Sequence, residues 1–351
     1  MNKLNSQSYM QSAEIRRNRY ILLVLAVVFL ALAAGSFFIG RYPVSVGDCV
    51  FYLKAWFFES ESGLSAPAAA VIGQIRLPRV MAALLVGGAL AMSGAAYQGV
   101  FRNPMVSPDI LGATAGAGFG AAVGILFLLP ALGIQLLSFA CGLIAVGMSY
   151  LISKTVGRRE NITLVLVLAG MVVSALFSAF IAVTKYLADP YSKLPEITFW
   201  LMGSLSATTF YDLLFVLPPV IISAAALLLL RWRLNVLVFG DEEASALGMD
   251  TQKYRIVVIV CSTLLTASVV SISGQIGWVG LVIPHLSRMM VGPNYRYLLP
   301  ASFLVGASYL LLVDNIARNL LQVEIPLGIL TAIIGAPVFI GLLLRGRKGW
   351  N

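Results

Sequence analysis

Long runs without a charged residue set the hydrophobic pattern of this chain. A helix that crosses the ~30 Å hydrocarbon core of a bilayer needs about 20 residues, and each run is long enough for one or two such helices. The runs do not show the strict alternation over about 10 residues that is typical of membrane β-barrel strands. The pattern therefore predicts transmembrane helices. The uncharged runs are Ile21–Gly40, Val80–Phe101, Ile110–Ser153, Asn161–Thr184, Leu213–Leu230, Ile256–Ser287, Tyr297–Val313 and Ile325–Leu344.

The two longest runs each accommodate two helices. The run 110–153 divides at the sequence LPALG (129–133), and the run 256–287 divides near the sequence SGQ (273–275). The second helix of the latter run is short for a crossing and contains Pro284. We therefore predict an all-α integral membrane protein with ten crossings. They lie near residues 20–40, 78–100, 110–128, 134–154, 162–184, 210–230, 256–272, 276–291, 298–316 and 326–344.

The distribution of charge supports this class and gives an orientation. Charged residues make up 11% of the 351-residue chain, whereas soluble domains typically contain about 25%. Ten crossings place both ends of the chain on one side, together with 17 of the 24 Lys and Arg residues. The positive-inside rule makes that side cytoplasmic. The basic residues are scattered over short loops, so the net charge of +9 reflects topology and we predict no nucleic-acid partner.

The domain organisation follows from the crossings. We predict one ten-helix domain over residues 20–345, with a cytoplasmic tail on either side at 1–19 and 346–351. The longest cytoplasmic loop of this domain spans residues 231–255.

Groups that carry chemistry are sparse. The single histidine, His285, has no neighbouring nucleophile or carboxylate in the sequence, and neither H-E-x-x-H nor G-x-x-x-x-G-K-[ST] occurs. The three cysteines show no spacing pattern. We therefore predict no catalytic residue, no metal site and no cofactor bound by this chain. Ion-driven carriers usually need carboxylates or histidines inside the membrane, so the sequence favours an energy source on another chain.

The third predicted crossing carries glycines at Gly112, Gly116, Gly120 and Gly124. Small residues four apart leave one helix face as bare backbone, which lets helices approach closely in lipid. We predict close helix packing within the subunit, with a subunit contact or a pore-lining face as the alternatives.

Four segments, in this order along the chain, resemble one family of membrane proteins. They are RLPRVMAALLVGGALAMSGAAYQGVFRNPMVSPDILG (76–112), GDEEASALGMD (240–250), GWVGLVIPHLSR (277–288) and DNIARNLLQVEIPLGILTAIIGAPVFIGLLLR (314–345). These segments look like those of the FecCD-type permeases, the ten-helix membrane subunits of ABC importers for vitamin B12, ferric siderophores and haem. The resemblance implies the type II ABC importer permease fold.

The same resemblance implies partners and a location. The chain would pair with a second copy of itself in the inner membrane of a bacterium. It would also bind two ATPase subunits that hold ATP and Mg, and a substrate-binding protein outside the cytoplasm. A different class stays open: an ion-coupled secondary transporter or channel that works without an ATPase. An integral-membrane enzyme is a more distant alternative.

The resemblance also assigns roles to polar segments on the cytoplasmic side. Asn103, Pro104 and Met105 match the cytoplasmic gate, although a simple connector between helices is the alternative. Within the loop 231–255 the resemblance implies a coupling helix that sits in a groove of the ATPase subunit. Two glycines bracket an acidic piece in which Ala244 and Leu247 share one face, and a solvated loop is the alternative. The predicted coupling residues are Gly240, Asp241, Glu242, Ala244, Leu247 and Gly248.

On the outer side, Arg76, Arg79 and Arg318 run against the positive-inside bias. The resemblance implies that these arginines receive acidic residues of the substrate-binding protein, and helix-end snorkelling is the alternative. The fifth crossing and its outer extension would line the substrate pathway. The candidate pathway residues are Met171, Ser174, Ser178 and Trp200, of which the first three share a helix face that also suits plain packing.

Overall fold

The computed structural model describes residues 3–58, 65–156 and 162–346, and the described part of the chain is helical without strands. Its α-helices are α1 (Lys3–Ser36), α2 (Val46–Phe58), α3 (Ala66–Ala70), α4 (Leu77–Val100), α5 (Ala113–Leu126), α6 (Ala131–Val156), α7 (Ile162–Leu187), α8 (Lys193–Met202), α9 (Phe210–Phe239), α10 (Asp241–Ala246), α11 (Thr251–Ser273), α12 (Val279–Val291), α13 (Tyr295–Asn319) and α14 (Leu327–Gly346). A π-helical segment η1 (Val71–Arg76) joins α3 to α4, and a 3-10 turn η2 (Pro108–Leu111) precedes α5.

Ten of these helices correspond to the ten predicted crossings. Eight of the described helices are long and apolar enough to span a membrane: α1, the rod from α3 to α4, α6, α7, α9, α11, α13 and α14. The other two, α5 and α12, are apolar but only 14 and 13 residues long. Helix α5 starts late because Pro108 begins a separate 3-10 turn and Gly112 then takes a left-handed φ of +87°. The chain is thus an all-α integral membrane protein.

Several helical features lie outside the predicted crossings, among them α3, η1 and α10. Helix α1 begins at Lys3, so most of the predicted tail 1–19 is helical, because no Pro or Gly interrupts it before the crossing. Helices α2 and α8 are short elements that the hydrophobic runs do not predict. The predicted tail 346–351 lies outside the described residues except for its first residue.

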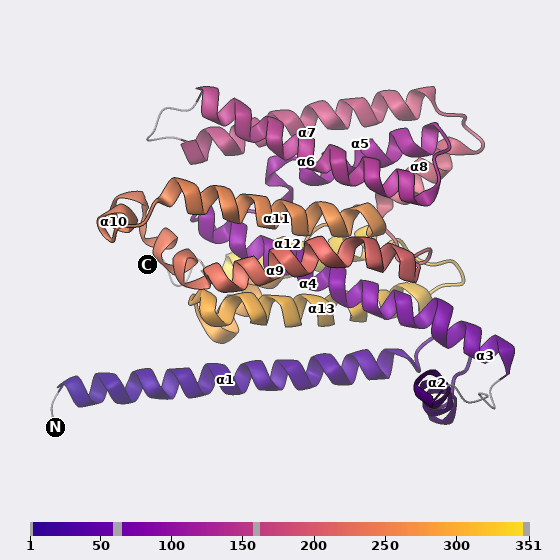
Figure 1. Ribbon diagram of the computed structural model, residues 1–351, viewed down its shortest axis with the longest axis horizontal. Coiled ribbons are helices and arrows are strands. Elements are labelled where there is room, and N and C mark those ends of the chain that lie inside the picture. The colour runs from indigo at the N-terminus through magenta and orange to yellow at the C-terminus, as the bar shows by residue number, and fades with distance from the viewer. Residues whose placement is uncertain (1–2, 59–64, 157–161, 347–351) are drawn as a thin grey trace.

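The helices pack in two groups, with α5, α6, α7 and α8 forming one and α4 at the centre of the other (Figure 1). Helix α4 is buried on almost every side by α9, α11, α12 and α13. Helix α1 lies at the edge of the bundle against α13. The start of α1 and α10 lie at one end, called here the α10 end, and α2, α3 and α8 lie at the other, called the α8 end (Figure 1). The prediction that the α10 end is cytoplasmic stays a prediction.

Glycines allow the tightest helix contacts. An added Cβ on Gly94 of α4 would collide with the backbone of Gly280 in α12, and one on Gly87 with the backbone of Gly306 in α13. In α5, Gly116 and Gly120 face the backbone of α6 in the same way, at Cys141 and Leu137. The prediction that the glycine face of α5 serves close packing within the subunit is therefore confirmed.

Candidate functional site

The turn between α4 and α5 lies at the α10 end. Asn103, Pro104 and Met105 are exposed there. The side-chain oxygen of Asn103 accepts a hydrogen bond of 2.9 Å from the backbone N–H of Met105, which closes the kind of turn that asparagine favours. Arg102 reaches this turn through a φ of +49°, an uncommon backbone conformation for a residue with a side chain. The predicted gate residues thus form a tight, solvent-facing loop.

The segment that follows this loop is held between two helices. An added Cβ on Gly280 of α12 would collide with the ring of Pro108, and one on Gly170 of α7 would collide with the backbone of Ile110. The turn η2 therefore fits only because both neighbouring helices present bare backbone at that point. A movement of η2 itself would therefore press against α7 or α12.

Polar side chains that the sequence analysis did not single out fix the loop further. Gln98, which is buried in the last turns of α4, donates to the carbonyl of Leu281 at 3.2 Å and accepts from Arg288 at 3.1 Å. Asp109 accepts a hydrogen bond from the hydroxyl of Thr114. Burial raises the pKa of Asp109, and the Thr114 hydroxyl opposes that shift. In the sequence, the feature that could have identified Gln98 is its amide side chain inside the apolar run 80–101.

Helix α10 projects from the same end of the bundle (Figure 1). It starts after Gly240, whose φ is +128°, and Gly248 follows it with a φ of +77°, so both bracketing glycines adopt conformations that side chains rarely take. An ion pair of 2.5 Å between Asp241 and Arg255 ties α10 to α11. Glu242 is exposed.

One prediction about α10 is wrong. Ala244 is fully buried against the chain, whereas Leu247 is 72% exposed, so these residues do not share a face. The backbone N–H of Leu247 still donates to the carbonyl of Glu243 at 3.2 Å, as in an α-helix. Residues three apart are rotated by about 60° around a helix, so Ala244 faces the bundle while Leu247 faces away from it.

The predicted gate and the predicted coupling segment are in direct proximity. An added Cβ on Gly240 would lie 3.2 Å from a guanidinium nitrogen of Arg102. The side chain of Arg102 thus extends from the gate loop to the first residue before α10. The side chain of Arg102 therefore connects α10 directly to the gate loop.

At the α8 end the structure brings Arg79 and Arg318 together, but it buries them. The guanidinium of Arg79 donates to both oxygens of Asp314 at 2.8–3.1 Å and to both oxygens of Glu324 at 2.8 and 3.0 Å. Arg318 lies 3.8 Å from Asp314 and donates to the hydroxyl of Ser36 at 2.7 Å. Within this cluster only Glu324 reaches the surface, with its side chain 35% exposed.

Arg76 is buried beside this cluster and donates to the backbone carbonyls of Phe37 and Tyr42. The cations that run against the positive-inside bias therefore have partners within the chain. Arg79 bonds Asp314 of the distant helix α13, whereas Arg76 and Arg318 donate to residues at the end of α1 or just after it. Asp314 precedes Arg318 by four residues, a helical pair that the sequence does show. Nothing in the sequence pattern indicates that Arg79 pairs with Asp314, which lies 235 residues away.

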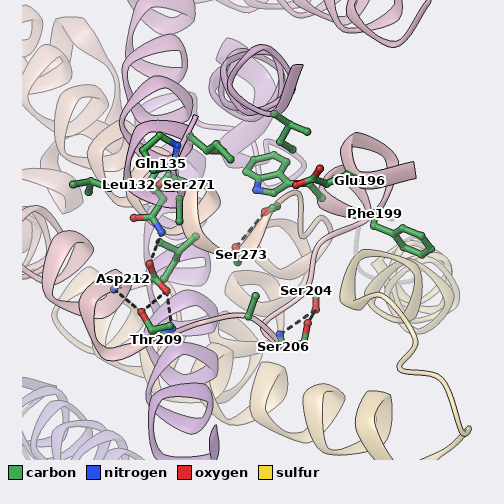
Figure 2. Close-up of a pocket in the computed structure, with 18 of the residues that line it drawn as sticks. Leu132, Gln135, Glu196, Phe199, Ser204, Ser206, Thr209, Asp212, Ser271 and Ser273 are labelled. Atoms are coloured by element: carbon green, nitrogen blue, oxygen red, sulfur yellow. Dashed lines mark hydrogen bonds between the residues drawn. The ribbon is translucent and has the colours of Figure 1, made fainter. Parts of the chain in front are cut away.

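A cavity of about 770 Å³ opens at the α8 end between α6, α8, α9 and α11 (Figure 2). Trp200 lines it, as do the exposed Glu196 and the serines Ser204, Ser206, Ser271 and Ser273. The hydroxyls of Ser271 and Ser273 are bonded to backbone carbonyls of α11. Asp212 also lines the cavity, but its carboxylate accepts from the backbone and hydroxyl of Thr209 at 2.6 and 2.8 Å, in a capping box whose N-cap is Thr209. No Lys or Arg is among the described residues that line the cavity, so its described wall carries carboxylates and no positive charge.

The other three candidate pathway residues lie on α7, away from this cavity. Met171 and Ser178 are exposed on the side of α7 that the chain leaves uncovered. Ser174 is half-buried, and an added Cβ on Gly112 would lie 3.2 Å from its hydroxyl. The structure therefore separates Trp200 from the α7 residues and places the latter on a surface open to lipid or to another chain.

Comparisons with known proteins agree with this arrangement. The chain is 44% identical over 331 residues to the molybdate import system permease protein MolB of Haemophilus influenzae, a match covering 94% of this chain and 96% of that protein. It is 40% identical over 290 residues to the cobalamin import system permease protein BtuC of Halobacterium salinarum, covering 82% and 76% respectively. A solved structure described as an inward-facing metal-chelate type ABC transporter superposes with a TM-score of 0.84 at 43% identity, covering 93% of this chain and 99% of that one. The sequence model of the FecCD transport family matches residues 22–345, and the chain therefore belongs to the FecCD transport family.

Proposed function

We propose that this chain is the membrane-spanning permease subunit of a binding-protein-dependent ABC importer. It would work as a homodimer, with two ATPase subunits at the α10 end and one substrate-binding protein at the α8 end. ATP and Mg would be held by the ATPase subunits, and this chain would carry out no bond chemistry. The observation that carries the proposal is the exposed, glycine-bracketed α10 beside the gate loop in a chain that matches the family over nearly its whole length.

The geometry of α10 suits a two-state mechanical element. Glu242 and Leu247 point away from the bundle and offer a mixed acidic and apolar surface to a groove. Ala244 and the Asp241–Arg255 ion pair anchor the opposite side. When an ATPase subunit moves α10, the displacement reaches Arg102 and the gate loop with no intervening helix.

Substrate would enter through the α8 end. The cavity there has a largely apolar wall with two carboxylates, Glu196 and Asp212, and lacks a cationic side chain among the residues described, so it would not retain an anion strongly. Such weak retention suits a conduit whose affinity resides in the binding protein. Met171, Ser174 and Ser178 of α7 would line the continuation of the path where two copies meet.

For the substrate we favour a metal oxyanion of the molybdate type. The 44% identity to a molybdate permease over 94% of the chain supports this choice over the iron chelates, haem and cobalamin that the sequence resemblance first suggested. The matches to permeases of cobalamin and haem import systems, at 40% and 39% identity, keep large chelates as the second candidate.

The docking of the binding protein would take place over the ends of α4 and α13. Because Arg79 and Arg318 are bonded to Asp314, the group that an approaching protein meets first is Glu324. Docking through the arginines would therefore require an acidic residue of the partner to displace Glu324 from Arg79.

A transport assay tests the function. The chain is reconstituted in liposomes with its ATPase and binding protein, and uptake of molybdate, a ferric siderophore, haem and cobalamin is measured with and without ATP. We expect uptake of one substrate class that requires ATP and both partners. Uphill accumulation under an ion gradient by liposomes that hold only this chain would instead identify a secondary transporter.

A further inference from the structure

A second hollow, of about 430 Å³, lies at the α10 end and takes no part in the proposed transport path. It is enclosed by the start of α1, the end of α9 and the start of α13. Asn235 fixes its frame, since the Asn235 amide donates to Asn294 at 3.0 Å and its oxygen accepts from the backbone of Tyr295 at 2.8 Å. The hollow is thus bordered by α9 and α13 segments that are hydrogen-bonded to each other.

Two cations line this hollow without a partner. The guanidinium groups of Arg231 and Arg296 are exposed, and neither forms a hydrogen bond or an ion pair with any described residue. The guanidinium of Arg296 lies 5.9 Å from the ring centre of Tyr297. Glu14 of α1 is the one carboxylate among the described lining residues, and it is exposed. The charge of the hollow therefore favours an anion.

The hydroxyl of Tyr297 gives an independent indication of a ligand. Tyr297 is only 6% exposed, it lines the hollow, and its hydroxyl has no hydrogen-bond partner among the described groups. A buried hydroxyl without a partner lowers stability, and buried tyrosines usually find one. The hydroxyl oxygen itself is covered, so an acceptor oxygen of a ligand in the hollow would satisfy this donor once the Tyr297 side chain turns toward it.

The surroundings identify the kind of anion. Trp232, which lines the hollow, ends a strip of exposed apolar residues along α9 that includes Ile222 and Leu229. Exposed tryptophan is typical of the level where lipid headgroups meet hydrocarbon. A ligand that fits both surfaces has an anionic head beside the arginines and long apolar chains beside the strip.

We propose that this hollow binds the phosphate headgroup of an anionic phospholipid. Arg231 and Arg296 pair with the phosphate, Tyr297 donates its hydroxyl to a phosphate oxygen, and the acyl chains lie along α9. Because basic residues at a membrane surface attract anionic lipids, the site would hold a lipid at the junction of α1, α9 and α13 and so tie the peripheral α1 to the bundle.

Native mass spectrometry of the full-length chain in detergent tests this proposal. The probes are dioleoylphosphatidylglycerol, dioleoylphosphatidylcholine and inorganic phosphate. We expect tight retention of phosphatidylglycerol and an about thirtyfold weaker affinity in the Arg231→Gln/Arg296→Gln variant, the loss typical of two cations at an anionic surface. Tyr297→Phe should weaken binding about fivefold. Glu14→Gln should strengthen it, because it removes the one opposing charge.

Arg19→Gln is the matched control, since Arg19 is an exposed cation near the middle of α1 that does not line the hollow. It should leave the affinity within about twofold of the wild-type value. Thermal unfolding in phosphatidylcholine should show Tyr297→Phe to be at least as stable as the wild type, because a buried hydroxyl without a partner lowers stability. Equal retention of both lipids, or equal losses in Arg19→Gln and the double variant, would overturn the proposal. Stabilisation by inorganic phosphate equal to that by phosphatidylglycerol would overturn the assignment to a lipid.

Discussion

At the scale of single residues, Arg79 joins helices that lie far apart in the sequence. Its guanidinium bonds Asp314, which is fully buried, and Glu324, which reaches the surface. Such a buried pair need not stabilise a protein more than well-packed apolar residues would. Removing one partner alone is costly, since the other charge remains in a medium that solvates it poorly.

We therefore expect Arg79→Leu to lower the free energy of unfolding by about 3–5 kcal/mol. Thermal unfolding of the purified chain in detergent measures the loss. The double variant Arg79→Leu/Asp314→Leu should regain part of it, because Glu324 can turn to the solvent, whereas the buried Arg318 loses its carboxylate partner and keeps its hydrogen bond to Ser36. A single variant as stable as the wild type would show that the cluster is not structural.

Gly280 provides a second test at this scale. We expect Gly280→Ala to reduce transport strongly, since its new methyl group would push Pro108 and the gate loop away from α12. The matched control is Gly147→Ala in α6, where an added Cβ meets nothing within 4 Å. That control should keep full uptake and gain up to about 1 kcal/mol of stability from its better helix propensity. Equal uptake by the two variants would contradict the tight fit of the loop.

At the scale of elements, helix α10 has one side buried against the bundle at Ala244 and one side exposed at Leu247. We expect Leu247→Asp to weaken binding of the ATPase subunit about thirtyfold or more, the effect of losing a central apolar anchor. The unfolding of the isolated chain should not change, because Leu247 is exposed. Co-purification with the ATPase measures the effect.

Val323→Asp is the matched control for that experiment. Val323 is 77% exposed in the loop at the opposite end, so the same change in polarity lies far from α10. It should leave ATPase binding unaltered. If both variants retain the ATPase equally, α10 is not the coupling element.

The turn between α7 and α8 should respond to acid. The hydroxyl and backbone N–H of Ser192 and the backbone N–H of Tyr191 donate to Asp189, which lowers its pKa below the ordinary value of 3.8. A carboxylate with a lowered pKa stabilises the fold above its ordinary pKa, and that contribution is lost as the pH falls through the lowered value. Amide hydrogen exchange at Ser192, corrected for its intrinsic rate, should thus accelerate as the pH falls from about 6 through the lowered pKa of Asp189. Asp189→Asn should show no such change over the same pH range.

The sequence predicted the elements better than their contacts. Runs of uncharged residues mark all ten membrane helices because lipid leaves so few alternatives to a helix. Helices α2 and α8 were missed, since each is short and carries charged residues such as Asp48 and Glu196. Ala244 and Leu247 were wrongly placed on one face because residues three apart are rotated by about 60° around a helix, and the spacing alone does not reveal which of them faces the bundle.

The candidate site shows the same division. The exposed turn at Asn103 follows from its prolines and asparagine, which act locally. The burial of Arg79 depends on Asp314 and on the way α4 and α13 pack, which a pattern along one helix does not contain. The roles of the gate, coupling and docking residues rest on the family resemblance and stay predictions.

At the scale of the whole molecule, several helices present apolar faces that this chain does not cover, among them α7 with Met171. If α7 lines the path between two copies, a cysteine there meets water and can form the reactive thiolate. In a chain with Cys49, Cys141 and Cys261 replaced by Ala, we expect Ser178→Cys to react with a charged aqueous thiol reagent at least about tenfold faster than Val27→Cys. Val27 is exposed on α1, where the proposed partner is lipid.

Mass spectrometry of the labelled chains in the assembled transporter gives the two rates. Slow reaction at both positions would place the α7 face in lipid and move the pathway elsewhere. Fast reaction at both would show that α1 also borders water.

The pairing of Arg79 with Asp314 also has a consequence for biosynthesis. A ribosome completes α4 long before it makes α13, because 235 residues separate the two charges. During that interval the guanidinium of Arg79 has no carboxylate partner. The nascent α4 must therefore stay beside the insertion machinery or at its edge, where water can hydrate this charge. The α8 end of the bundle can therefore reach its final packing only after Asp314 has been synthesised, so a ribosome that stalls earlier leaves a fragment in which Arg79 has no carboxylate partner on α13.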